Sequence, residues 1–162
     1  MENSKKFIEL AIGSVSNRAY GIEPGKLSKY LQPNQELYRS LFLLDDTAFD
    51  HFKDQKTIKS YKGTFALDRL VFDIDKGKNS GEDTILRTKH FIEALFDMGL
   101  DRDLIRVWFS GRGFHVEIPD VYGFEESAKL PYVVKLTIDK QFGDMIDNIY
   151  DRGRLIRVGY SF

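Results

Sequence analysis

The segment from Phe65 to Asp75 is the feature that most constrains the fold of this chain. It is strongly apolar, its Val and Ile residues recur at the two-residue period of a β-strand, and it ends on two aspartates. On a strand, Asp73 and Asp75 project from the same face. Two neighbouring carboxylates repel each other unless a cation lies between them, and hard ions such as Mg²⁺ prefer oxygen ligands. A divalent-metal site is therefore expected here; the alternative is a strand end with merely solvated aspartates.

Composition sets outer limits on the function. With 42% hydrophobic and 30% charged residues among 162, the chain has the make-up of a soluble protein with one compact core. No apolar run approaches the roughly 20 residues of a membrane span, so we expect no membrane contact and a cytoplasmic location. The absence of cysteine excludes thiolate zinc sites. The net charge of -1 means that any site for a polyanion must be a local concentration of Arg and Lys.

The residues before the central strand indicate a small α/β module over residues 1–63. The apolar spacing predicts a helix from Ser4 to about Asn17 and a strand from Glu36 to Leu44. A short helix from Thr47 to about Phe52 and a polar, lysine-rich connection to Gly63 complete the module.

The residues from 64 to 162 predict a regular alternation of elements. The expected order is a strand over 65–75, a helix over 82–98, strands over 104–109 and 114–118, largely helical chain over 125–150, and a strand over 154–160. This is the β-α-β-β-α-β order of ferredoxin-like and RNA-recognition folds, with strand order 4-1-3-2. We therefore expect an α+β protein in which the small N-terminal module packs on this sheet.

The predicted topology brings three polar stretches to one end of the sheet. They are the end of the first strand, the start of the third strand and the approach to the fourth. Asp147 can supply a third carboxylate beside Asp73 and Asp75, with Asp144 and Asp151 as rivals for the same role. A pair of metal ions held by such carboxylates is a common device for phosphoryl transfer.

A candidate anion site lies beside these carboxylates. The turn Ser110-Gly111-Arg112-Gly113 offers backbone N–H groups and a guanidinium, and His115 follows it on a strand. Arg154 and Arg157 lie in the last predicted strand, where a buried guanidinium needs a carboxylate or phosphate partner. Since they are three residues apart, we expect one to serve the site and the other to brace an aspartate.

Together these motifs resemble those of the archaeo-eukaryotic primase (AEP) superfamily, which includes primases and primase-polymerases of plasmids and phages. The resemblance rests on three motifs in order, namely Phe72-Asp73-Ile74-Asp75, Ser110-Gly111-Arg112-Gly113-Phe114-His115, and Ile146-Asp147 followed by Arg154-Leu155-Ile156-Arg157. It covers somewhat over half of the chain. It implies the AEP fold, with the module over 64–162 as the catalytic part.

The resemblance also implies roles for individual residues. Asp73, Asp75 and Asp147 would bind two divalent ions, Mg²⁺ or Mn²⁺. The triphosphate of an incoming nucleotide would be held by Ser110, Arg112, Gly113, His115, Arg154 and Arg157. Arg39 is a further candidate contact for nucleotide or template, with packing as an equally good interpretation.

The implied reaction is DNA-templated nucleotidyl transfer. The 3′-hydroxyl of a primer attacks the α-phosphate of an NTP or dNTP, and pyrophosphate leaves. The implied partners are single-stranded DNA template, a primer and a further helical, zinc-binding or helicase domain outside this chain. The implied setting is a bacterial, archaeal or phage-infected cell.

Three other functions fit parts of the sequence. A non-catalytic nucleic-acid-binding or interaction module on the same fold would need exposed aromatics on the central strands, whereas Phe72, Phe114 and Val116 are expected in the core. A metal-dependent glycosyltransferase also uses Asp-x-Asp for a nucleotide-sugar, but behind a larger nucleotide-binding half. A phosphatase of the haloacid-dehalogenase type expects Thr or Val where Lys76 stands.

Overall fold

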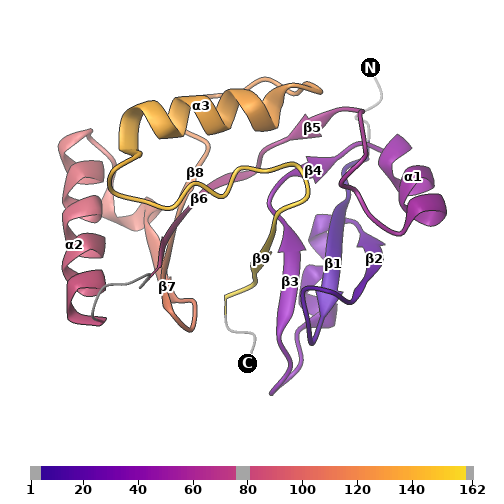
Figure 1. The fold of residues 1–162 in the computed structure, drawn as a ribbon, viewed down its shortest axis with the longest axis horizontal. Coiled ribbons are helices and arrows are strands. Elements are labelled where there is room, and N and C mark those ends of the chain that lie inside the picture. The colour runs from indigo at the N-terminus through magenta and orange to yellow at the C-terminus, as the bar shows by residue number, and fades with distance from the viewer. Residues whose placement is uncertain (1–4, 76–80, 160–162) are drawn as a thin grey trace. The chain divides into compact units, whose positions relative to one another are not determined.

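The computed structural model describes residues 5–75 and 81–159, and over these it confirms the expected α+β class. Its strands are β1 (Ile8–Ile12), β2 (Arg18–Ile22), β3 (Leu37–Ser40), β4 (Leu43–Leu44), β5 (Phe65–Ala66), β6 (Arg69–Asp75), β7 (Arg106–Phe109), β8 (Gly113–Pro119) and β9 (Leu155–Arg157). Its helices are α1 (Thr47–Gln55), α2 (Gly81–Asp97) and α3 (Leu130–Phe142), with 3-10 turns η1 (Pro24–Tyr30) and η2 (Arg102–Leu104) (Figure 1). Across the described residues, none of the helices has the length and apolar character to cross a membrane.

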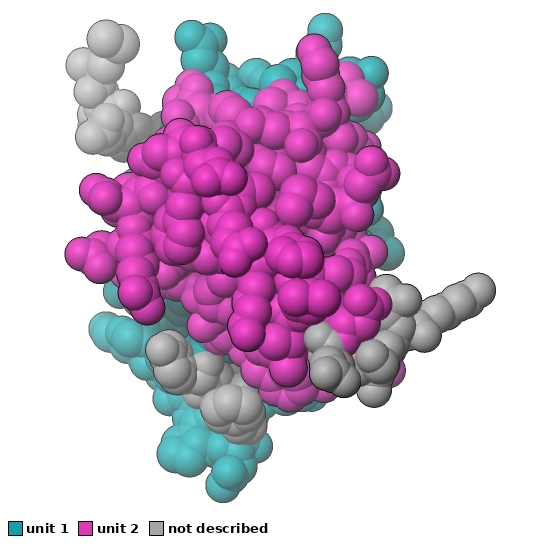
Figure 2. All heavy atoms as spheres, turned by 90° about the vertical axis from the view of Figure 1, so that its left-hand side faces the viewer, with its two compact units in different colours: residues 1–68, 124–133, 150–162 teal, residues 69–123, 134–149 magenta. Residues whose placement is uncertain are grey.

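The chain divides into two compact units (Figure 2). Unit 1 comprises residues 1–68, 124–133 and 150–162, and unit 2 comprises residues 69–123 and 134–149. The candidate carboxylates and the Ser110–Gly113 turn belong to unit 2, whereas Arg154 and Arg157 belong to unit 1.

Unit 1 is built on an antiparallel sheet with the strand order β2-β1-β3-β9, beside a small β4-β5 pair. The helix predicted over Ser4–Asn17 is wrong, because strand β1 and the turn that follows it occupy this segment, and β2 begins only at Arg18. Its side chains are buried on both faces, Ile8 and Leu10 as well as Glu9 and Ala11. A strand covered on both faces loses the apolar alternation that distinguishes it from a helix.

The rest of the N-terminal prediction is closer to the structure. The strand expected over Glu36–Leu44 is present as β3 and β4, interrupted at the fully buried Leu41 and Phe42. The short helix expected at Thr47 is α1. Just before it, the Asp45 carboxylate accepts hydrogen bonds from the Thr47 N–H and the Tyr61 hydroxyl. Burial acts to raise the pKa of Asp45, but these hydrogen bonds prevail and lower it below its ordinary value.

Unit 2 contains a three-stranded antiparallel sheet with the order β6-β8-β7. This is the expected relation of the first three strands of the β-α-β-β-α-β pattern. Residues 125–150, expected to be largely helical, form a helix only over α3. On one face of the sheet, the Phe72 ring lies 4.8 Å from Phe91 of α2 and 5.5 Å from Phe142 of α3. Phe72 and Val116 are buried core residues as predicted, whereas Phe114 is half-buried.

The predicted position of the last strand is wrong. Strand β9 pairs antiparallel with β3 of unit 1, through Tyr38 opposite Arg157 and Ser40 opposite Leu155, and not with β6. Leu155 and Ile156 are both buried, one on each face of the sheet. Such a segment fits beside any strand that has an open edge, so its sequence does not specify its neighbour.

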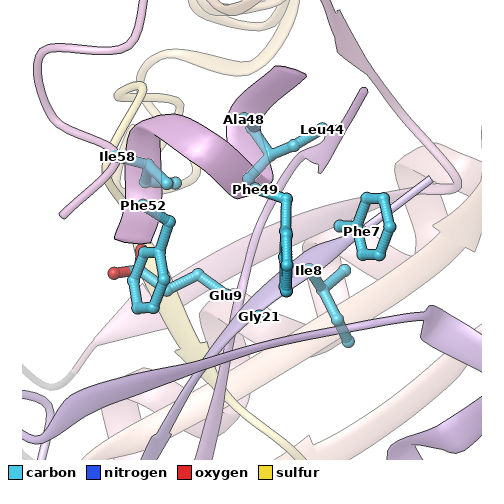
Figure 3. Close-up of a pocket in the computed structure, with 9 residues that line it drawn as sticks. All are labelled: Phe7, Ile8, Glu9, Gly21, Leu44, Ala48, Phe49, Phe52 and Ile58. Carbon is cyan, nitrogen blue, oxygen red and sulfur yellow. The ribbon is translucent and has the colours of Figure 1, made fainter. Parts of the chain in front are cut away.

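The Glu9 carboxylate is the unusual feature inside unit 1. Only 1% of Glu9 is exposed, and it reaches an apolar cavity of about 10 Å³, the size of one water molecule (Figure 3). Its Oε2 lies 3.2 Å from Nη1 of Arg18, while its Oε1 has no hydrogen-bond partner in the described part of the chain. Burial raises the pKa of Glu9 from 4.5 to about 7, against the opposing charges of Arg18 and Lys59.

Glu9 is therefore expected to make stability fall as the pH rises. Because its pKa is higher in the folded than in the unfolded chain, folding binds a proton between pH 4.5 and about 7. The free energy of unfolding then decreases across this window, by up to about 3 kcal/mol, and levels off above it. Urea unfolding from pH 4 to pH 9 tests this, with Glu9→Gln as the comparison. The variant should lack this part of the slope, and parallel curves for the two proteins would contradict the assignment.

Candidate functional site

The candidate site lies on the face of the unit 2 sheet opposite the Phe72 core. The strand register places Asp73 opposite His115 and His115 opposite Trp108, so these three residues form one row across β6, β8 and β7. Directly opposite residues of antiparallel strands project from the same face. Asp75 is opposite Gly113 in the next row, which joins the Ser110–Gly113 turn to the carboxylates.

Asp73 and His115 form the closest contact of the site. Nε2 of His115 lies 3.3 Å from Oδ1 of Asp73. An ionised carboxylate only accepts hydrogen bonds, so the contact favours a proton on Nε2. His115 is 7% exposed, while 24% of the Asp73 side chain is exposed. The pair thus has a buried imidazole and a carboxylate that solvent or a ligand can reach.

The Asp73–His115–Trp108 row contains two polar atoms without partners. Nδ1 of His115 and Nε1 of Trp108 are buried and have no hydrogen-bond partner within the described residues. Their rings meet edge to face, with centroids 5.4 Å apart. An unpaired buried polar group costs about 1–3 kcal/mol. Most buried polar atoms in folded proteins have a hydrogen-bond partner, so these two atoms are exceptions.

Asp147 takes the place beside β6 that the predicted fourth strand was expected to fill. Its backbone N–H donates to the Asp73 carbonyl oxygen at 2.7 Å, in an isolated antiparallel bridge. Its carboxylate Oδ2 accepts the Asp75 N–H at 3.0 Å. Of the three rivals named from the sequence, Asp147 is hydrogen-bonded to both aspartates of β6. Asp144 is an exposed residue after α3, and Asp151 belongs to unit 1.

Sequence reasoning missed two residues of this region. Trp108 could have been predicted as part of this region from the strand register, because it lies directly opposite His115 and so on the same face of the sheet. For Arg87 of α2, no sequence pattern indicated a role in the site, and only its position on a helix could be predicted. Its guanidinium donates to the Asp75 carbonyl at 3.3 Å and to the Met145 carbonyl at 3.4 Å. It therefore ties the end of β6 to the segment that leads into Asp147.

The turn between β7 and β8 is tight and presents its arginine to solvent. The Ser110 N–H donates to the Gly113 carbonyl, and the Gly113 N–H donates to the Ser110 hydroxyl. Gly111 has φ +105°, a conformation that favours glycine. A Cβ on Gly113 would lie 2.1 Å from the Ile74 carbonyl oxygen, so only glycine fits there. Arg112 is exposed and available to an anionic ligand.

The predicted arginines of unit 1 have their own partners. Arg157 donates to the Tyr38 hydroxyl and pairs with Glu36, and the Tyr38 hydrogen bond is the main reason that its pKa is raised. Arg154 is exposed and lies 4.0 Å from Asp151. Arg39 is buried and donates to the Asp68 carboxylate from Nη1 and Nη2, at 3.0 and 3.2 Å, which agrees with the packing interpretation.

The donor set at the end of β6 fits a divalent cation by its chemistry. Asp73, Asp75 and Asp147 lie at one strand end, where the Asp147 N–H donates to the Asp73 carbonyl and the Asp147 carboxylate accepts the Asp75 N–H. Carboxylate oxygens are the preferred ligands of Mg²⁺ and Mn²⁺. In the described residues, no three His, Cys, Asp or Glu side chains are already gathered around one point.

Comparison of the chain with models of protein families, with curated proteins and with solved structures gives no match.

Proposed function

We propose that this chain is the catalytic core of a DNA primase or primase-polymerase of the archaeo-eukaryotic type, and thus a nucleotidyltransferase. The observation that carries the proposal is the meeting of Asp73, Asp75, His115 and Asp147 at one end of β6, although they span 75 positions of sequence. Three carboxylates beside an imidazole and a tight turn form a suitable donor set for a metal-bound triphosphate.

The proposed roles follow from what each side chain can do. Asp73, Asp75 and Asp147 hold the divalent ions, which when bound neutralise charge on the phosphate oxygens. Arg112 pairs with a phosphate through its exposed guanidinium, and the Ser110–Gly113 turn supplies polar groups beside it. His115 contacts Asp73 through Nε2 and orients this carboxylate.

The test is metal-dependent nucleotide binding followed by primer extension. A fluorescent nucleoside triphosphate is titrated with Mn²⁺, with Mg²⁺ and with EDTA, and a primed single-stranded DNA template is then supplied with NTPs or dNTPs. The proposal expects a component of binding that EDTA abolishes, and addition of nucleotides directed by the template. Triphosphate binding that is indifferent to metal, with no extension under any condition, would refute it.

A second candidate, a binding-only nucleic-acid module, is favoured by an aromatic pair on the other face of the sheet. Phe109 is 57% exposed, and its ring meets that of Phe114 edge to face at 5.7 Å. Exposed aromatic side chains on a sheet are platforms for base stacking. If this function is correct, oligonucleotide binding survives EDTA and is weakened by Phe109→Ala, and no extension is detected.

A further inference from the structure

Unit 1 contains a hollow lined mainly by basic side chains. It has a volume of about 510 Å³ and is lined by Val15, Arg18, Lys59, Asp151, Arg152, Gly153, Arg154 and Leu155. Four of these residues are cationic and one is anionic, in a chain whose net charge is -1. The hollow is thus a local concentration of positive charge of the kind that a polyanion site requires.

Two of the arginines are held in place by hydrogen bonds. Arg18 donates from Nη2 to the Gly153 carbonyl at 2.8 Å and from Nε to the Val15 carbonyl at 3.4 Å, besides its contact with Glu9. Arg152 donates to the Tyr61 and Ala128 carbonyls at 3.4 and 3.2 Å. Carbonyl oxygens carry no net charge, so they fix Arg152 without neutralising it, whereas Arg18 is also paired with the Glu9 carboxylate. Fixed cations lose less conformational entropy when they bind a ligand.

The other two cations are free to move toward a ligand. Lys59 and Arg154 are exposed. The ion pair of Arg154 with Asp151 spans 4.0 Å at the surface and is therefore weak. Gly153 allows the Lys59 stem to approach, because a Cβ at this position would lie 2.8 Å from Cγ of Lys59.

We propose that this hollow is a binding site for a phosphate-bearing ligand of about nucleotide size. Guanidinium groups match phosphate oxygens in shape and charge, and pockets for whole small molecules have volumes of about 300–1,000 Å³. Val15 and Leu155 offer apolar surface for the rest of the ligand. The site is independent of the proposed nucleotidyl transfer, because its lining residues all belong to unit 1 and none is a metal-binding carboxylate of unit 2.

The ligand phosphates can belong to a free polyphosphate or to a phosphodiester strand, and two probes separate these sources. Inorganic triphosphate is titrated calorimetrically, and a labelled oligothymidylate is titrated by anisotropy. Both titrations contain EDTA, so that the carboxylates of unit 2 hold no metal. Binding of triphosphate alone indicates a free polyphosphate, and tighter binding of the oligonucleotide indicates a strand.

The deciding comparison uses two double variants with the same change in charge. Lys59→Gln/Arg154→Gln removes the two mobile cations of the hollow, and Lys26→Gln/Lys29→Gln removes two exposed lysines of η1 outside it. The first variant is expected to bind at least about tenfold more weakly than the wild type, and the second within about twofold. Thermal melting checks that both are folded. Equal affinities for the two variants, or no binding of either probe by the wild type, would overturn the proposal.

Discussion

Asp147→Asn is expected to reduce template-directed nucleotide addition about 100-fold or more. The Asp147 carboxylate accepts the Asp75 N–H, and its backbone is bonded to Asp73, so it belongs to the proposed metal-binding set. An asparagine oxygen can still accept this hydrogen bond, so the substitution removes the charge and leaves the local structure. The measurement is primer extension with Mn²⁺ or Mg²⁺ at saturating nucleotide, beside titration of the metal.

The matched control is Asp144→Asn. Asp144 is also exposed and lies only three positions earlier. Within the described residues, however, it makes no hydrogen bond or ion pair with β6, in contrast to Asp147. Its activity is expected to stay within about threefold of the wild type, since a solvated surface charge contributes little. If Asp144→Asn and Asp147→Asn lose activity equally, the contact with β6 does not identify the third metal ligand. If neither loses activity, the metal site at β6 is refuted.

Gly113→Ala is expected to destabilise unit 2 by about 3 kcal/mol. The added methyl group would meet the Ile74 carbonyl oxygen at 2.1 Å and Cα of Asp75 at 2.7 Å. Both are backbone atoms of a paired strand, so neither can move aside without breaking the β6–β8 ladder. Because Asp75 is opposite Gly113, the same shift displaces the candidate site. Urea unfolding measures the stability, and triphosphate binding measures the site.

Gly25→Ala supplies the control for this substitution. Gly25 lies in η1, and a Cβ there would meet no atom within 4 Å. Its free energy of unfolding is expected to change by no more than about 0.5 kcal/mol. A Gly113→Ala protein as stable as Gly25→Ala would show that β6 and β8 separate easily at this end, contrary to the close approach described above.

The parts of unit 2 that determine the candidate site could be predicted because their local signals agree. The apolar strand that ends on Asp73 and Asp75, the helix that became α2, and the tight turn before His115 each carry a clear period or turn composition. The turn sets the register of β7 with β8 and so places Trp108 opposite His115, whereas Asp73 is placed opposite His115 by the register of β6 with β8. The sequence indicated Asp147 as one of three candidates for the third carboxylate, and only the bridge to Asp73 distinguishes it from the other two.

What could not be predicted depends on contacts between distant parts of the sequence. The burial of β1 on both faces conceals its strand period, so Ile8 to Ile12 looked helical. Strand β9 pairs with β3 because β3 has an open edge, and no local pattern in residues 154–160 indicates this partner. Arg87 acts through its guanidinium on carbonyl groups of two other segments, and a helix position gives no sign of such partners.

The pairing of β9 with β3 also affects the chain while it is being made. Residues 155–157 are synthesised more than a hundred positions after Leu37–Ser40. Until then, β3 presents backbone N–H and C=O groups along one open edge, and such edges template association between chains. The nascent protein, and any proteolytic fragment that ends before Arg154, therefore carries an aggregation hazard along β3, and pairing with β9 covers this edge in the folded unit 1.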